Sequence, residues 1–238
     1  MHPSEHARPN KAHISQLDAS SRHTTDSPTN QPGLGIPMKT FLHVGCGAQR
    51  KANTTRGFNT DNWQELRLDI DEKVQPDIVG TMTDMSGVPD ASVDALFSSH
   101  NIEHLYAHEV PTALKEFQRV LKPEGFAIIT CPDLQSICAL VAQGKLVEPA
   151  YHTAQGIPIA PIDVLYGWRL PMAQGNLYMA HRCGFTEDVL RATLLGAGFN
   201  SVGTLARPEC FDLWAVASKS TLTEDALKQL GAEYFFGS

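Results

Sequence analysis

From Thr40 onward the sequence alternates short apolar runs with amphipathic segments, and this alternation restricts the fold more than any other feature. Five apolar runs have the length and content of buried strands. In chain order they are TFLHV (40–44), ELRLDID (65–71), DIV (77–79), DALFSS (94–99) and FAIITC (126–131). Strands that alternate with helical segments build a mostly parallel sheet with helices on both faces. The sequence therefore predicts an α/β fold with a Rossmann-like, doubly wound sheet.

The clearest helix lies between the fourth and fifth of these runs. In EVPTALKEFQRVLKPEG (109–125), apolar residues recur on one helical face, and the Pro and Gly of KPEG end the helix. A later helix is expected over 187–195, with Thr186 as its N-cap. Two strands at 201–207 and 211–218 follow, separated by only three residues. They predict an antiparallel hairpin at the edge of the sheet.

Three segments differ from this α/β pattern. Residues 1–37 are rich in Ser, Thr, Pro, Asn and His and are predicted to be a disordered leader. The α/β domain is expected to span 38–220, and a short helix with an aromatic tail occupies 221–238. Within the domain, residues 133–186 are too long for an ordinary crossover. Connections of that length in compact domains are usually functional, so this insertion is predicted to form a substrate pocket and lid.

Composition and charge exclude several classes of partner. Of the 238 residues, 42% are hydrophobic and 19% are charged, which is ordinary for a globular protein. No apolar run reaches the roughly 18 residues needed to span a bilayer, and no secretory signal is recognised. A cytoplasmic protein without a membrane partner is therefore expected. The net charge of -7 disfavours binding to long nucleic acids, and five cysteines without a C-x-x-C pair favour reduced thiols.

Polar and glycine-rich residues follow the predicted strands where a ligand would bind. Parallel strands bring their carboxyl ends to one edge of the sheet. GCG (45–47) follows the first strand, and its missing side chains allow a ligand close to the backbone. Asp69 and Asp71 follow the second strand, TMTDM (81–85) the third and SHNIEH (99–104) the fourth. The sequence therefore predicts a nucleoside ligand, because one edge combines a glycine turn, a polar loop and a carboxylate that can accept two hydrogen bonds from a ribose diol.

These elements, in this order, resemble the class I S-adenosylmethionine-dependent methyltransferases, and more narrowly the predicted bacterial methyltransferases of type 11. The motifs that carry the resemblance lie within residues 40–133: LHVGCGAQRK, LDID, PDASVDALFSSHNIEHL, ALKEFQRVLKPEGF and CPDL. The resemblance implies S-adenosyl-L-methionine as cofactor. It also implies methyl transfer to a small-molecule substrate, and a hydroxyl of a sugar or another metabolite is the expected acceptor.

The resemblance also implies which residues bind the cofactor. In the family, the glycine turn holds the amino-acid part, the acid after the second strand holds the ribose, and the loop after the third strand brackets the adenine. Residues after the fourth strand lie over the thioether. The corresponding cofactor-binding residues here are Gly45, Cys46, Gly47, Asp69, Ile70, Thr83, Asp84, Met85 and Ser99.

Transfer to a hydroxyl or an amine also requires that the acceptor lose a proton. A histidine is suited to this because its pKa lies near neutrality. The candidate bases are His100 and His104 after the fourth strand and His181 near the end of the insertion. Asp133, which follows the fifth strand, is the candidate for an orienting carboxylate.

Two positions depart from the family pattern. His43 stands where relatives have an acidic residue, and Gln49 stands where they have a third glycine. Residues 48–63 also lack the apolar periodicity of a first helix. An inactive, methyltransferase-like binding module is therefore the alternative to an enzyme.

A third hypothesis comes from H-x-x-E-H at 100–104, the pattern of inverted zinc proteases. On a helix, His100, His104 and His108 would share one face. The first of them, however, lies at a predicted strand end, which disfavours a zinc-dependent hydrolase, and no metal ligand is predicted. Glu103 and His104 are instead expected either to shape the loop as a hydrogen-bonded pair or to face the substrate.

Overall fold

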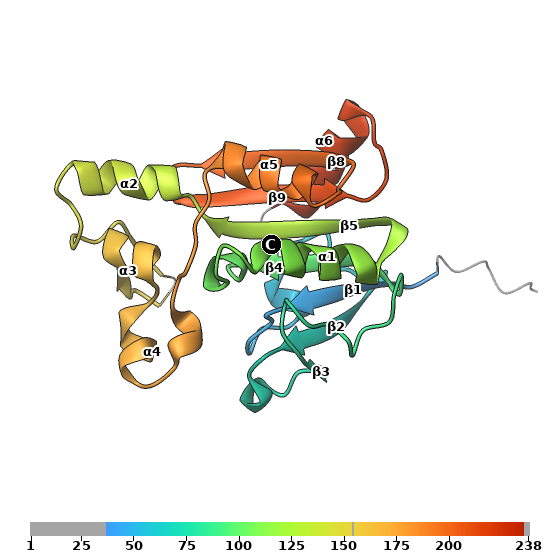
Figure 1. Cartoon of the computed structure of the whole chain (residues 1–238), viewed down its shortest axis with the longest axis horizontal. Coiled ribbons are helices and arrows are strands. Elements are labelled where there is room, and N and C mark those ends of the chain that lie inside the picture. Colours follow the sequence, from blue (N-terminus) through green and yellow to red (C-terminus); the bar gives the residue numbers. More distant parts are fainter. Residues whose placement is uncertain (1–36, 154, 236–238) are drawn as a thin grey trace, which may run out of the picture. The chain divides into compact units, whose positions relative to one another are not determined.

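A seven-stranded sheet lies at the centre of the computed structural model, which describes residues 37–153 and 155–235 (Figure 1). The strand order is β3-β2-β1-β4-β5-β9-β8. The strands are β1 (Lys39–Val44), β2 (Trp63–Asp69), β3 (Ile78–Val79), β4 (Val93–Ser99), β5 (Leu121–Pro132), β8 (Ser201–Arg207) and β9 (Asp212–Ser218). Strands β1 to β5 run parallel to one another, whereas β9 is antiparallel to both β5 and β8. The predicted Rossmann-like fold with a C-terminal antiparallel hairpin is confirmed.

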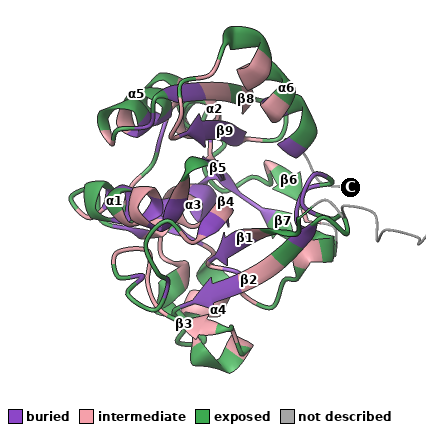
Figure 2. Cartoon of the chain, turned by 90° about the vertical axis from the view of Figure 1, so that its right-hand side faces the viewer, coloured by how far each residue is buried: buried purple, intermediate pink, exposed green. Residues whose placement is uncertain are grey.

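Helices α1 (Val110–Val120) and α5 (Glu187–Gly196) cover one face of the sheet, and α6 (Glu224–Tyr234) covers the other (Figure 2). The sequence of β1 shows why both faces need cover. Leu42 and Val44 belong to the apolar core under α1 and α5, and Phe41 belongs to the core under α6. Side chains alternate along a strand, so apolar residues at successive positions require apolar partners on both faces.

The face under α6 is filled by aromatic side chains. The segment after β1 contains only a short 3-10 helix, η1 (Lys51–Asn53), as its lack of apolar periodicity predicted. Phe58 from this segment lies between Phe41 and Tyr234, with ring centroids 4.4 and 4.7 Å away. The Nε1 of Trp63 donates a hydrogen bond of 3.1 Å to the Tyr234 hydroxyl. The C-terminal helix therefore docks where a first helix would otherwise pack.

The insertion forms a group of short elements beyond the carboxyl ends of the parallel strands (Figure 1). They are α2 (Leu134–Ala142), β6 (Tyr151–His152), β7 (Pro158–Ile159), α3 (Pro161–Tyr166), α4 (Arg169–Ala173) and η4 (Leu177–Met179). Ile137, Ile159 and Val164 make a small apolar core of their own. The insertion is thus a folded layer over the edge at which the sequence predicts a ligand.

Two further 3-10 helices, η2 (Glu72–Val74) and η3 (Ile102–His104), follow β2 and β4. The predicted leader lies, apart from residue 37, outside the described residues, which all belong to one compact unit. Within that unit, no described helix has the length and apolar content to cross a membrane.

Candidate active site

The turn after β1 is built from glycines that no other residue could replace without strain. Gly45 and Gly47 have φ angles of +59° and +51°, a conformation that favours glycine. A Cβ on Gly45 would lie 2.1 Å from the Asn101 Oδ1 atom. The same Asn101 side chain donates a hydrogen bond of 2.9 Å to the carbonyl of Val44. The glycine turn and the loop after β4 therefore touch directly.

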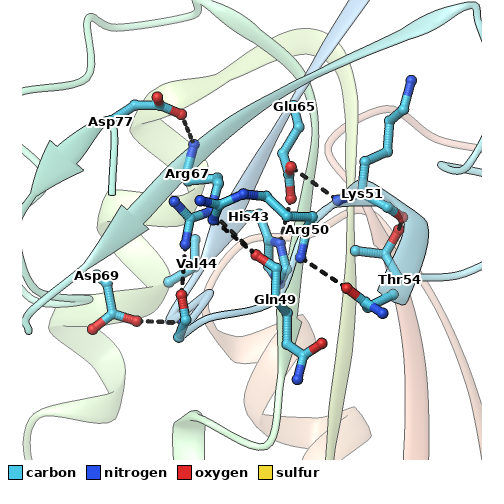
Figure 3. Close-up of polar contacts among 12 residues, drawn as sticks. His43, Val44, Gln49, Arg50, Lys51, Thr54, Glu65, Arg67, Asp69 and Asp77 are labelled. Carbon is cyan, nitrogen blue, oxygen red and sulfur yellow. Dashed lines mark hydrogen bonds and ion pairs between the residues drawn. The ribbon is translucent and has the colours of Figure 1, made fainter. Parts of the chain in front are cut away.

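Arg67 of β2 connects this glycine turn to the loop that follows β2. Its side chain is buried, and the guanidinium donates to the carbonyls of Gly47 at 2.6 Å and Gln49 at 3.2 Å (Figure 3). It also donates to the carbonyl of Gln75 at 2.8 Å. Its backbone amide donates to the Asp77 carboxylate at 2.8 Å. A planar guanidinium can serve several carbonyls at once because its donors point in fixed directions. Arg67 thus fixes the shape of the turn.

Asp69 is the last residue of β2 and lies beside the glycine turn. One carboxylate oxygen accepts a hydrogen bond of 2.7 Å from the Gly47 amide, and the other accepts one of 2.8 Å from the Asp71 amide. An ionised carboxylate has about four lone-pair sites, so roughly two remain for a ligand. The carboxylate is therefore both held in place and able to accept further hydrogen bonds.

His43 faces away from this edge and pairs with an acid on the neighbouring strand. Its Nδ1 atom lies 2.7 Å from the Glu65 Oε1 atom, and both side chains are largely buried (Figure 3). The Lys51 amide donates to the other Glu65 oxygen at 2.9 Å. Burial alone raises the pKa of Glu65, but the hydrogen bonds from His43 and Lys51 outweigh it, and the pKa lies below its ordinary value. A negative charge thus lies behind the glycine turn, supplied by β2 and not by β1.

A cavity of about 400 Å³ opens at the carboxyl edge of the sheet, over the glycine turn. Six of the nine predicted cofactor-binding residues line it: Gly45, Cys46, Gly47, Asp69, Ile70 and Ser99. The insertion covers part of it through Asn176, Tyr178, Met179 and Arg182. We call this space the cofactor cavity.

In the loop after β3, Thr81 and Met82 line the cofactor cavity in place of the three residues predicted there. The backbones of Thr81 and Asp84 exchange two hydrogen bonds of 3.2 Å, which closes a tight turn and directs its start toward the cavity. The hydroxyl of Thr83 forms a hydrogen bond with the Thr81 hydroxyl. The exposed Asp84 carboxylate accepts a hydrogen bond from the Ser86 amide, and Met85 is fully buried in the core.

A second cavity of about 370 Å³ lies next to the first, between the sheet edge and the insertion. All three candidate bases, His100, His104 and His181, line it together with Tyr151 and Trp168. His100 and His104 also line the cofactor cavity, so they form a wall common to both spaces. We call this second space the acceptor cavity.

Asp133 lies apart from the three histidines and lines neither cavity. Its buried carboxylate caps α2 by accepting from the Gln135 amide at 3.0 Å and from the Ser136 hydroxyl. Glu103, which is 1% exposed, is instead the carboxylate beside the histidines, and its Oε1 atom lies 3.4 Å from the His100 Nδ1 atom.

Glu103 and burial act in opposite directions on the histidines around it. Desolvation lowers the pKa of His100, and the Glu103 carboxylate raises it by more, so the pKa lies above its ordinary value. Burial raises the pKa of Glu103 itself, but His100 lowers it by more. For His181 burial dominates, and its pKa lies below the ordinary value despite Glu103. His181 therefore loses a proton more readily than an ordinary histidine, whereas His100 holds one more readily.

Sequence reasoning assigned no site role to Arg67, Thr81 or Met82, which support or line the cofactor cavity. A charged residue between apolar neighbours in ELRLD was the available signal for Arg67, because such a residue must find partners inside the fold. Glu103 was expected either to form a hydrogen-bonded pair with His104 or to face the substrate. It borders the acceptor cavity, and among the described residues no hydrogen bond reaches its carboxylate oxygens.

Comparison with known proteins gives one family match and several similar folds. Residues 42–129 match the family model described as a methyltransferase domain. The PH0226 protein of Pyrococcus horikoshii OT3 is 15% identical with a TM-score of 0.50, over 79% of this chain and 84% of that chain. An S-adenosylmethionine-dependent methyltransferase of Archaeoglobus fulgidus is 15% identical with a TM-score of 0.49, over 77% and 87%. One of Aquifex aeolicus is 17% identical with a TM-score of 0.47, over 78% and 85%. At these identities the structural similarities concern the fold alone.

Proposed function

We propose that this chain, a class I S-adenosylmethionine-dependent methyltransferase, methylates a hydroxyl group of a small molecule that binds in the acceptor cavity. The observation that carries the proposal is the wall shared by the two cavities. One cavity has a glycine turn and a carboxylate, the other has three histidines, and His100 and His104 border both. Methyl transfer is an in-line displacement, so donor and acceptor must meet at such a boundary.

The residues of the cofactor cavity fit S-adenosylmethionine, which supplies an electrophilic methyl group on a sulfonium. The space over Gly47 is open, since a Cβ there would have no neighbour within 4 Å. The glycine turn would hold the amino-acid part, and the remaining lone pairs of Asp69 would accept the ribose hydroxyls. The adenine would lie against Thr81 and Met82.

Within the acceptor cavity we assign His100 as the general base. It borders both cavities, and the Glu103 carboxylate 3.4 Å away would stabilise the imidazolium that forms. The acceptor oxygen forms a bond to the methyl carbon while the carbon–sulfur bond breaks. The hydroxyl proton goes to His100, and S-adenosylhomocysteine is the other product. Tyr151 and Trp168 provide the flat apolar surface for the body of the acceptor.

Calorimetric titration with S-adenosylmethionine and S-adenosylhomocysteine tests the cofactor assignment. Replacing Asp69 by Ala should weaken binding by about 1–3 kcal/mol, because ribose hydroxyls lose their acceptor in a partly buried site. Asp61→Ala is the matched control, because the exposed Asp61 lies outside the cofactor cavity, and its affinity should change by no more than about twofold.

His100→Gln should lose far more turnover with a hydroxylated acceptor, measured as S-adenosylhomocysteine release, than affinity for S-adenosylhomocysteine, because His100 borders both cavities. Unchanged binding in Asp69→Ala would refute the cofactor assignment. A well-folded parent protein that binds neither compound would instead support the non-catalytic binding module.

A further inference from the structure

Glu103 lacks the partners that a buried carboxylate requires. Its side chain is 1% exposed, and among the described residues no hydrogen bond reaches either oxygen. The nearest cationic group is His100, as an ion pair of 3.4 Å. An ionised carboxylate in such a place is costly unless it is paired with a cation or coordinates a metal.

Two other histidines beside Glu103 are held in a form suited to metal binding. The Nδ1 atom of His104 lies 3.1 Å from the carbonyl of Ala180, and that of His181 lies 2.7 Å from the carbonyl of Val164. A carbonyl oxygen only accepts, so in both hydrogen bonds Nδ1 carries the proton. A ring in this tautomer keeps a free lone pair on Nε2. Metal-binding histidines use this arrangement because it fixes the tautomer and the orientation of the ring.

The three side chains converge on one point. A ligand atom from each of Glu103, His104 and His181 lies within 4.8 Å of the others, and the two imidazole rings are 4.9 Å apart. Backbone bonds hold the two segments together, because the amides of Arg182 and Cys183 donate to the Glu103 carbonyl at 2.8 and 3.2 Å. Acceptor atoms that face one another without a donor repel, and a cation between them removes that repulsion.

We propose that Glu103, His104 and His181 bind a divalent transition-metal ion of the zinc type. Two imidazole nitrogens and one carboxylate oxygen form a three-ligand set that leaves a coordination position open. All three residues border the acceptor cavity, so an oxygen of the acceptor can take that position. This use of the metal rests on the proposed function, whereas the site itself does not. The second Glu103 oxygen stays available to His100.

This site differs from the one that H-x-x-E-H suggests. His100 lies at the end of β4 with a φ angle of +53° and does not belong to the group of three ligands. His108 is exposed and stacks on Tyr106. The ligand that completes the set, His181, comes from the insertion and lies far away in the sequence. His108 therefore provides a matched control.

The test uses the full chain, purified without an affinity tag and stripped with a chelator, and titrates it with Zn²⁺ alone. Because the segment 1–37 contains four more histidines, each variant is compared with the parent protein. Loss of a supporting residue around a metal weakens binding by about 10–100-fold, so loss of a ligand in His181→Ala or Glu103→Gln should cost at least about tenfold. His108→Ala should bind Zn²⁺ like the parent.

Substitution by Co²⁺ gives a second readout that does not depend on the variants. Intense visible bands of the parent with one equivalent of Co²⁺ indicate low coordination, as expected for three protein ligands and one open position. Two results would overturn the proposal: weak bands typical of six-coordinate Co²⁺, or equal Zn²⁺ affinity of the parent and His181→Ala. In that case a proton shared by Glu103 and His100, and not a metal ion, would compensate the buried carboxylate. S-adenosylhomocysteine binding, measured separately, tests the proposed function alone.

Discussion

Replacing Arg67 by Met should weaken cofactor binding although the Arg67 side chain does not line the cofactor cavity. The guanidinium makes two hydrogen bonds to the glycine turn, at Gly47 and Gln49, and two on the opposite side, at Val74 and Gln75. Methionine keeps the aliphatic packing of the side chain but removes all four bonds.

Each hydrogen bond from a charged donor contributes about 1.5–3 kcal/mol, and water can reach carbonyls at the rim of a cavity and replace part of that. We therefore expect Arg67→Met to lower the free energy of unfolding by about 2–4 kcal/mol. If the binding-competent turn falls to about 1–10% of the population, the affinity for S-adenosylhomocysteine falls by about 10–100-fold.

Thermal or urea denaturation measures the stability change, and calorimetric titration measures the affinity. Arg50→Met is the matched control, because exposed Arg50 donates only one side-chain bond, of 3.3 Å, to the same Gln49 carbonyl. Its stability should change by no more than about 0.5 kcal/mol. If Arg67→Met is destabilised yet binds S-adenosylhomocysteine like the parent, Arg67 stabilises the fold without positioning the turn, and the reasoning fails.

Three further predictions concern the rest of the fold. Phe58→Ala should lower stability by about 3–5 kcal/mol in urea denaturation, because it leaves a cavity between Phe41 and Tyr234; a loss below 1 kcal/mol would contradict this. The Glu65 pKa lies below its ordinary 4.5, so the ionised group stabilises the fold above about pH 4.5, and this contribution disappears as the pH falls through the folded-state pKa. Glu65→Gln should therefore lose less stability than the parent between about pH 7 and pH 3. Iodoacetamide should modify exposed Cys138 and Cys210 well before buried Cys46, whose pKa burial raises to about 11, as peptide mass spectrometry can establish.

The strands and main helices could be predicted because burial leaves a periodic signal in the sequence. The apolar runs before the glycine turn and around DALFSS became β1 and β4, and the apolar face between them and β5 became α1, whose Leu114 and Phe117 are buried as predicted. The short link between the last two runs correctly predicted the β8–β9 hairpin. Its inner strand, β9, is buried along its whole length.

Side-chain roles in loops could not be predicted in the same way, because backbone hydrogen bonds there leave no periodic signal. The tight turn between Thr81 and Asp84 decides that residues 81 and 82, and not 83 to 85, face the cofactor cavity. Asp133 similarly follows a parallel strand, as a catalytic carboxylate would, yet its oxygens cap α2. The convergence of Glu103 with His181 depends on how the insertion folds back, which local sequence does not encode.

The departures from the family pattern are best understood together with the missing first helix. A helix after the glycine turn would offer its N-terminus to a carboxylate and would pack on the sheet. Here α6 and Phe58 do the packing, and side chains of β2 support the turn: Arg67 binds its carbonyls, and Glu65 pairs with His43 and holds the Lys51 amide. His43 thus pairs with Glu65 of the next strand, so an acidic side chain still lies behind the turn. The loss of two family residues and one helix therefore does not by itself argue for a lost cofactor site, since β2 supports the glycine turn of this chain.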